Sequence, residues 1–278
     1  MKVAVIGDGG WGTALGLVLH RNGHDVTMWG PFPDYVEETA RLGENRKFLA
    51  GVPLPPEMNW TAEPAEAAKG AGAVVLASPS AYYRAVAERF TDVVGPDVLA
   101  VSVAKGFDQA THQRMTEVAE DVLASGPVAA LSGPSHAEEV ARGVPSAVVI
   151  GCRDHDRAER LQQVFNRPEF RVYTSDDVVG VELGGALKNV MALAAGISDG
   201  LGYGDNTKAA LITRGLAEAS RVAQALGAHP ATCTGLAGVG DLIVTCMSKL
   251  SRNRAVGERL GRGETTEDIL SGMEQVAE

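Results

Sequence analysis

The stretch KVAVIGDGGWGTALGLVL, residues 2–19, opens the chain. It begins with an apolar, β-branched run typical of a buried strand, and the residues after Gly12 have the apolar spacing of a helix. Between them, Gly7, Gly9 and Gly12 form the pattern G-x-G-x-x-G in a strand-turn-helix context. The first glycine permits a tight turn, the second lets a pyrophosphate approach the backbone, and the third lets helix and strand pack closely. The stretch therefore predicts a dinucleotide-binding site.

The residues after the second expected strand, 25–29, leave the choice of dinucleotide open. An acid about 20 residues beyond the glycine pattern would bind a ribose 2′-hydroxyl, but Gly30 and Pro31 follow this strand instead. No arginine stands there to receive a 2′-phosphate, and Asp8 adds a charge that disfavours a nearby phosphate. A turn that binds nothing is the alternative, although unpaired N–H groups at a helix start attract anions.

Composition and length indicate a cytoplasmic protein with two domains. The chain has 278 residues, of which 45% are hydrophobic and 22% charged. Three cysteines without a C-x-x-C pattern favour a reducing compartment. A strand starting at residue 2 leaves no room for a signal peptide, and we expect no apolar run long enough to span a membrane. The net charge of −10 argues against nucleic-acid partners and membrane surfaces.

The order of apolar segments predicts an α/β fold followed by an all-α region. Strand-like runs recur at residues 73–77, 98–103, 128–131, 147–150 and 170–173, with helical segments at 82–90, 116–123 and 158–165 between most of them. Such alternation predicts a Rossmann-like, doubly wound, mostly parallel sheet. From Val178 onward only helical spacing is found. We therefore expect a dinucleotide-binding domain over residues 1–175 and an all-α substrate domain over 176–278.

Several polar segments follow the expected strands. In open α/β sheets the ligand lies beyond the carboxyl ends of the strands. This rule predicts one crevice along the first glycine turn, residues 78–80, Lys105 and residues 132–135, which the helical domain closes. Lys105 has a solvated strand end as its alternative, and Ser135 could simply cap the helix that follows, with Glu138 completing a capping box.

Lys188 is the most informative residue of the helical region. It is the only basic residue in the apolar helix expected over residues 178–197, and Gly184 and Gly185 lie one turn before it. Two glycines weaken a helix, so we expect another segment to approach closely there. A poorly solvated ammonium can lose its proton, whereas the alternative is a snorkelling or paired structural lysine.

Two later segments complete the set of candidates. Asp241, between glycines and an apolar run, either caps a helix or holds a cation such as Lys188. The segment Ser251-Arg252-Asn253-Arg254 combines guanidinium forks with a hydroxyl and an amide at an expected helix start, which suits a phosphate. A solvated helix start is the alternative. The sequence has neither metal-binding His-x-Glu spacing nor a nucleophile elbow, so no metal is expected.

Together these motifs resemble one family along the whole chain. In order they are Gly7-x-Gly9-x-Trp11-Gly12-Thr13, Ala104-Lys105-Gly106, Ser132-Gly133-Pro134-Ser135, Leu187-Lys188-Asn189-Val190, Ser198-Asp199-Gly200, Leu211-Ile212-Thr213-Arg214-Gly215, Gly240-Asp241-Leu242 and Ser251-Arg252-Asn253-Arg254. They are similar to the NAD(P)-dependent glycerol-3-phosphate dehydrogenases of the bacterial type. Members of that family continue with further helices beyond Glu278, so this edge of the cofactor site is expected to be incomplete.

The resemblance implies reversible reduction of dihydroxyacetone phosphate to sn-glycerol 3-phosphate, the precursor of glycerophospholipids, with NAD or NADP. It implies that Lys188 is the general acid/base, with Asp241 and Lys105 as further catalytic residues. The substrate contacts it implies are Lys105, Gly133, Ser135, Lys188, Asp241, Ser251, Arg252 and Asn253. With the glycine turn, the implied cofactor contacts are Gly7, Gly9, Gly10, Trp11, Gly12, Lys105, Ala137, Arg252, Val276 and Glu278.

Two other functions remain open from sequence. A β-hydroxyacid dehydrogenase would combine the same two domains with a carboxylate-binding site, against which Arg252 and Asn253 favour phosphate. A dinucleotide sensor would bind cofactor without consuming it. The oligomeric state is also open, with a homodimer as one candidate.

Overall fold

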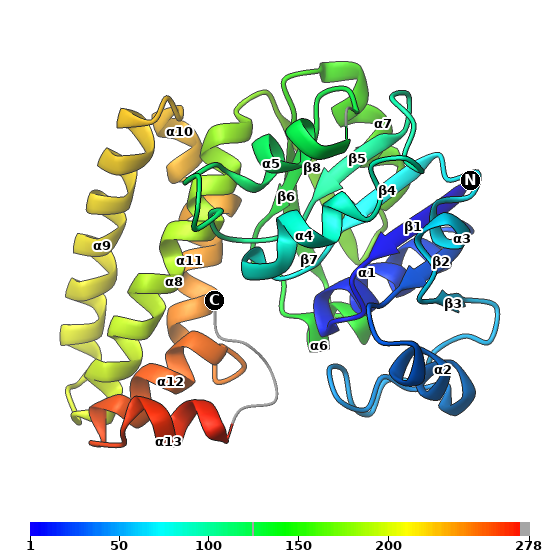
Figure 1. Cartoon of the computed structure of the whole chain (residues 1–278). Coiled ribbons are helices and arrows are strands. Elements are labelled where there is room, and N and C mark those ends of the chain that lie inside the picture. Colours follow the sequence, from blue (N-terminus) through cyan, green and yellow to red (C-terminus); the bar gives the residue numbers. More distant parts are fainter. Residues whose placement is uncertain (124, 273–278) are drawn as a thin grey trace.

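The computed structural model describes residues 1–123 and 125–272, which form a twisted eight-stranded sheet beside a set of helices (Figure 1). The strand order is β3-β2-β1-β4-β5-β6-β7-β8. All neighbouring strands are parallel except β6 and β7, so the expected mostly parallel, doubly wound sheet is confirmed. The strands are β1 (Lys2–Ile6), β2 (Asp25–Trp29), β3 (Asn59–Thr61), β4 (Ala73–Leu76), β5 (Leu99–Ser102), β6 (Ala129–Ser132), β7 (Ser146–Gly151) and β8 (Phe170–Ser175).

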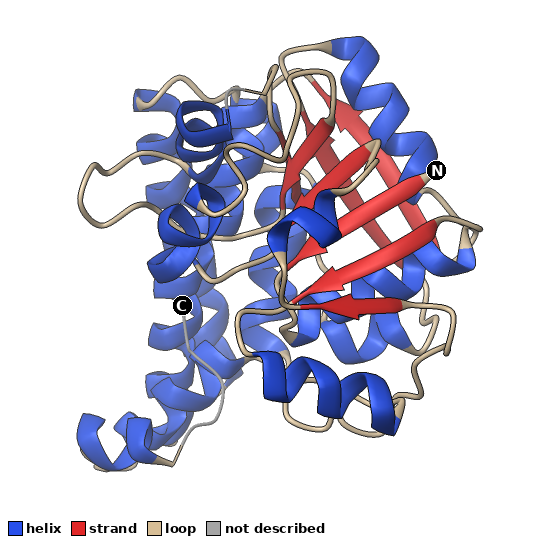
Figure 2. Ribbon diagram, turned by 45° about the vertical axis from the view of Figure 1, so that its right-hand side comes forward, coloured by secondary structure: helices blue, strands red, loops and turns tan. Residues whose placement is uncertain are grey.

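Helices cover both faces of the sheet (Figure 2). Along β1, Val3 and Val5 join one hydrophobic core, whereas Ala4 and Ile6 join the other, because successive strand residues point to opposite faces. Both faces are therefore buried, and this explains the continuous apolar runs. The helices of this part are α1 (Gly10–Arg21), α2 (Pro33–Leu42), α3 (Pro64–Ala68), η1 (Ser80–Tyr82), α4 (Tyr83–Glu88), α5 (Met115–Leu123), α6 (Ala137–Ala141) and α7 (His155–Phe165).

From residue 178 to residue 272 the chain forms helices and connecting loops, as expected. The elements are α8 (Val178–Gly200), α9 (Asp205–Ala225), α10 (Pro230–Cys233), the π-helical turn η2 (Leu236–Gly240), α11 (Asp241–Met247), α12 (Arg252–Gly261) and α13 (Thr266–Ser271). The sheet ends at Ser175 and α8 begins three residues later. The division into separate domains at this point stays a prediction.

Helix α8 is held from two directions. On one side, Glu182 pairs with Arg114 and accepts hydrogen bonds from the backbone N–H and hydroxyl of Thr116 at 2.9 and 2.7 Å. On the other, α12 crosses α8 so closely that a Cβ on Gly196 would lie 2.0 Å from the carbonyl oxygen of Arg254, and one on Gly257 would lie 2.0 Å from that of Leu193. The position of α8 is therefore fixed relative to both the sheet and α12.

Contrary to expectation, two segments are long and apolar enough to span a membrane by length and composition alone. They are Val178–Gly200 and Pro230–Met247, whose most apolar windows have a mean hydropathy of 1.4 and 1.3. Within the protein, 44% of the first window and 39% of the second are buried. Helix α8 contacts β6, β7, α9, α11 and α12, as a central helix of a folded region does. Its apolar composition is accounted for by these contacts.

Candidate active site

The glycine turn between β1 and α1 has little room for side chains except at one position. Gly7 has a φ of +127°, and a Cβ there would lie 2.7 Å from the carbonyl carbon of Ala77, after β4. A Cβ on Gly12 would lie 2.2 Å from the carbonyl oxygen of Gly7, and one on Gly10 would lie 2.4 Å from that of Phe48. By contrast, within the described residues nothing lies within 4 Å of a Cβ built on Gly9.

This open space fits a dinucleotide. Gly9 is the N-cap residue of α1 and makes no side-chain cap, so the first N–H groups of the helix face the opening without an intrahelical partner. Ala137, at the start of α6, lies beside the turn, with its Cβ 3.8 Å from a Cβ built on Gly10. The indole Nε1 of Trp11 is buried and has no hydrogen-bond partner in the described part of the chain.

The loops after β4, β5 and β6 meet at one rim, as the sheet rule predicts. Gly106 has a φ of +156°, and a Cβ there would lie 2.7 Å from the hydroxyl of Ser80. A Cβ on Gly240, from η2, would lie 3.4 Å from the ring of Pro134. Gly133 also has a positive φ, +144°. The helical region therefore closes against the carboxyl ends of the strands.

The two glycines before Lys188 face this rim. A Cβ on Gly184 would lie 2.3 Å from the carbonyl oxygen of Ala237 in η2. One on Gly185 would lie 2.7 Å from the hydroxyl of Ser132 and 3.3 Å from the side chain of Lys105. The close approach expected at these glycines is confirmed, and it brings Lys105 up to α8.

Three charged side chains from distant parts of the chain meet at this junction. Asp241, at the start of α11, is 1% exposed. One of its carboxylate oxygens accepts a hydrogen bond from Nζ of Lys105 at 2.7 Å, and the other accepts one from Nζ of Lys188. Asp241 does not cap α11, whose N-cap residue is Gly240. The alternative in which Asp241 holds a cation is therefore confirmed, and Asp241 holds two, Lys105 and Lys188.

The environment of Lys188 favours its neutral form. Its side chain is 8% exposed, and this burial lowers its pKa to about 7, against the opposing effect of Asp241 and together with the charge of Lys105. Burial alone would raise the pKa of Asp241, but the charges of Lys105 and Lys188 outweigh it and leave that pKa below its usual value. The amine is thus set to exchange a proton near neutral pH beside a carboxylate that stays ionised.

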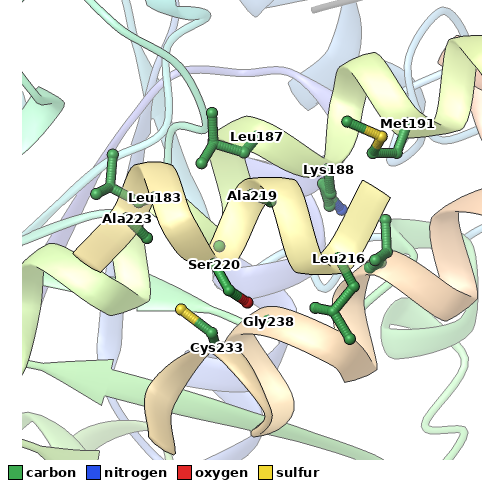
Figure 3. Close-up of a pocket in the computed structure, with 12 residues that line it drawn as sticks. Leu183, Leu187, Lys188, Met191, Leu216, Ala219, Ser220, Ala223, Cys233 and Gly238 are labelled. Carbon is green, nitrogen blue, oxygen red and sulfur yellow. The ribbon is translucent and has the colours of Figure 1, made fainter. Parts of the chain in front are cut away.

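A small apolar cavity of about 20 Å³ lies between α8, α9 and η2 beside Lys188. Figure 3 shows Leu187 and Met191 of α8 on either side of Lys188, and Leu216 of α9 also lines the cavity. The lining is mostly apolar, although it includes Ser220, and offers the stem of Lys188 little solvation; burial of this kind lowers the pKa of Lys188.

Two residues of the site were missed from sequence. The hydroxyl of Thr245 accepts a hydrogen bond from Nζ of Lys188 at 2.7 Å and donates one to the carbonyl oxygen of Asp241 at 2.6 Å. Its spacing of four from Asp241 on the expected helix could have indicated it. The second is His136, whose pKa is lowered mainly by burial and to a smaller extent by the charge of nearby Lys188. No sequence signal distinguished this histidine.

The other candidate residues lie in two places. Ser251 is the N-cap of α12 and accepts a hydrogen bond from the backbone N–H of Arg254 at 3.2 Å, while Arg252 and Asn253 form the first turn of that helix. The alternative in which Ser135 caps the following helix is wrong, because its hydroxyl donates to the carbonyl oxygen of Gly133 at 2.9 Å and α6 has His136 as N-cap. Val276 and Glu278 lie outside the described residues.

Comparison with known proteins identifies the family. The models for the N-terminus and the C-terminus of NAD-dependent glycerol-3-phosphate dehydrogenase match residues 2–158 and 177–278. Curated relatives named glycerol-3-phosphate dehydrogenase [NAD(P)+] include one from Chlorobium limicola, 48% identical over 282 residues, and one from Geobacter metallireducens, 49% identical over 280. Each alignment covers 100% of this chain and 84% of the relative.

Solved structures agree. The crystal structure of the glycerol-3-phosphate dehydrogenase from Coxiella burnetii has a TM-score of 0.96 and 36% identity, covering 99% of this chain and 85% of that one. The yeast enzyme from Saccharomyces cerevisiae has a TM-score of 0.84 and 29% identity, covering 98% of this chain and 86% of its own. The chain therefore belongs to the NAD-dependent glycerol-3-phosphate dehydrogenase family.

Proposed function

We propose that this protein reversibly reduces dihydroxyacetone phosphate to sn-glycerol 3-phosphate with NAD(H) or NADP(H), and that Lys188 is its general acid/base. The observation that carries the assignment of Lys188 is its burial, in contact with Asp241, at the carboxyl edge of a dinucleotide-binding sheet. The product supplies glycerophospholipid synthesis. Membership of the family supports the reaction, and the geometry supports the roles of the individual residues.

The chemistry divides between the cofactor and the protein. When bound, the nicotinamide supplies or accepts the hydride. In the direction of reduction, negative charge grows on the former carbonyl oxygen, and protonated Lys188 stabilises that charge and donates the proton. In the direction of oxidation, neutral Lys188 removes the proton of the hydroxyl group. A pKa near neutrality allows both directions.

Asp241 and Lys105 support this role. Asp241 fixes the amine of Lys188 and, being ionised, raises the affinity of Lys188 for its proton relative to an uncompensated site. Lys105 shares that carboxylate and is 18% exposed, so it reaches the rim where an anionic substrate would enter. With both lysines protonated, the three side chains carry one net positive charge, which attracts a phosphorylated substrate despite the acidic protein as a whole.

The remaining contacts are proposed from the motifs and the fold. Gly133 and Ser135 border the rim and would contact the substrate. Ser251, Arg252 and Asn253 begin α12, where free N–H groups and a guanidinium suit a phosphate. Gly7, Gly9, Gly10, Trp11, Gly12 and Ala137 would hold the dinucleotide around the open space at Gly9, and Lys105 and Arg252 would reach it from the other side.

The proposal is tested by following nicotinamide absorbance with dihydroxyacetone phosphate as substrate. We expect oxidation of NADH or NADPH that depends on this substrate and stops in Lys188→Met. A 3-oxo acid without phosphate should not replace it. Binding of the dinucleotide without consumption would instead identify a sensor and refute the proposed activity.

Assembly and location are also proposals. We expect a cytoplasmic protein that forms a homodimer and does not insert into membranes. Sedimentation and cell fractionation test both, and a monomer, or a protein recovered from the membrane fraction, would contradict them.

A further inference from the structure

Asp8 occupies an unusual position in the glycine turn. It lies between Gly7 and Gly9, and its side chain is turned inward, so that the residue is only 8% exposed. Its carboxylate oxygen Oδ2 is buried and has no hydrogen-bond partner within residues 1–123 and 125–272. A buried acceptor without a donor costs free energy, so the fold retains this carboxyl group at a penalty.

The carboxyl group of Asp8 lies against the end of β2. The backbone N–H of Gly7 donates to the carbonyl oxygen of Trp29 at 2.9 Å, which sets the two strand ends side by side. A Cβ on Gly30, the residue after β2, would lie 2.3 Å from Oδ2 of Asp8 and 2.7 Å from its Cγ. Asp8 therefore fills the space that a side chain at position 30 would occupy.

That space has a known use in dinucleotide folds, where an acid at the end of the second strand binds the ribose 2′-hydroxyl of NAD. We propose that Asp8, reaching across from the first strand, replaces the missing acid of β2, accepts the 2′-hydroxyl of NAD and rejects the 2′-phosphate of NADP. This inference rests on the proposed dehydrogenase function, because it names the cofactor of that same site.

The backbone around Asp8 is fixed. Nδ2 of Asn45 donates to the carbonyl oxygen of Asp8 at 2.7 Å and to the hydroxyl of Thr13 at 2.8 Å. The segment after α2 thereby holds the glycine turn in place before any cofactor binds. A carboxylate on such a backbone is preorganised, so little ordering cost remains when it accepts a hydrogen bond.

The charge of Asp8 is sensitive to pH. Burial raises its pKa to about 6, while its own backbone hydrogen bond and the charge of Lys47 oppose that change. Lys47, from the segment after α2, and Tyr35, from α2, are the ionisable groups that interact with it. Above that pKa the ionised carboxylate stands in a poorly solvated place, where a 2′-phosphate would be strongly repelled.

Direct binding of NADH and NADPH, measured by protein fluorescence without substrate, tests the inference at about pH 8. Wild type should bind NADH at least about tenfold more tightly than NADPH, a ratio that corresponds to about 1.4 kcal/mol. Asp8→Asn keeps an acceptor but loses the charge, so NADPH affinity should rise about tenfold or more while NADH affinity changes less than about threefold. Asp8→Ala should also weaken NADH by about tenfold, because the hydrogen bond is lost.

Asp34→Asn is the matched control, since Asp34 is an exposed acid near the end of β2 and should leave both affinities unchanged. The pH dependence of NADPH affinity is a second readout. Wild type should bind NADPH more tightly below about pH 6 than above it, because Asp8 becomes protonated. The same change of pH should raise the NADPH affinity of Asp8→Asn by a smaller factor, because only the 2′-phosphate titrates in that variant. Circular dichroism confirms that each variant is folded.

The outcomes separate the inference from the function on which it rests. Tighter binding of NADPH than of NADH by wild type, or an unchanged ratio in both Asp8 variants, overturns the role of Asp8 and would point to Lys47 as a receptor for the 2′-phosphate. Binding of neither dinucleotide refutes the proposed function itself.

Discussion

Replacing Asp241 by asparagine should shift the proton affinity of Lys188 in a direction that can be measured. Asp241 is 1% exposed and contacts both Lys105 and Lys188, so its charge is hardly screened by solvent. An opposite charge at this range raises the pKa of an amine by about 1 to 3 units, or about 1.4 to 4 kcal/mol. In Asp241→Asn the pKa of Lys188 should therefore fall from about 7 to below about 6.

The two directions of the reaction respond differently to this change. Oxidation of sn-glycerol 3-phosphate needs neutral Lys188, so the inflection of kcat against pH should move to lower pH. Reduction needs the ammonium form, and at about pH 7.5 its population, and hence kcat, should fall about tenfold or more. Steady-state rates measured in each direction between about pH 5.5 and 9.5 give both the inflection for oxidation and the fall in kcat for reduction.

A control substitution in α8, the helix that carries Lys188, makes the test specific. Glu182→Gln also removes a buried, paired carboxylate of α8, yet it should leave the inflection where it is, because Glu182 contacts Arg114 and Thr116 rather than Lys188. An inflection in Asp241→Asn that stays in place or moves to higher pH would refute the reasoning.

Three further substitutions test the structure around the site. Glu182→Gln should lower the free energy of unfolding by about 1 to 3 kcal/mol, because its buried hydrogen bonds to Arg114 and Thr116 lose the charge of the carboxylate, while Glu117 still pairs with Arg114. Glu117→Gln should cost less than about 1 kcal/mol, because the side chain of Glu117 is 39% exposed; urea denaturation compares the two variants. Gly9→Ala should keep the melting temperature of the protein, because a Cβ at position 9 meets no described atom, but it should lose NADH binding. The control Gly95→Ala, at an equally open position, should keep both properties; retained NADH binding in Gly9→Ala would show that no pyrophosphate approaches Gly9. Asp8→Asn should stabilise the protein by up to about 3 kcal/mol at about pH 8 but not near pH 4, because the folded pKa of about 6 lies above the ordinary aspartate pKa of 3.8 and the penalty appears only as pH rises through that interval. Equal effects at both pH values would contradict the raised pKa.

The parts of the fold that the sequence predicted are those with strong local patterns. The apolar run of β1, the glycine turn and α1 could be assigned because each is defined by neighbouring residues. β3 and α3 were not expected, since segments of three and five residues are too short for a period to appear. The antiparallel direction of β7 was not specified either, because it depends on pairing between β6 and β7 rather than on either strand alone.

The candidate site shows the same limit. Lys188 could be singled out because a lone cation in an apolar helix departs from the pattern, and Asp241 because it follows two glycines. By contrast, Lys105 and Lys188 share the carboxylate of Asp241, and Lys105 is 136 residues away from Asp241 in sequence. Local patterns do not reveal such a contact. The contact of Thr245 with Lys188 and that of Asp8 with the end of β2 also come from tertiary packing, since local spacing reveals neither of these partners.

The proposed reaction depends on the buried amine of Lys188, which would exchange the proton. Lys188→Met removes the amine and keeps a side chain of similar length. NADH should bind to this variant with unchanged affinity, because Lys188 is not among the proposed cofactor contacts. Turnover should fall by at least about a hundredfold in both directions, the contribution expected of a general acid/base. Near-normal turnover in a folded Lys188→Met protein would contradict it.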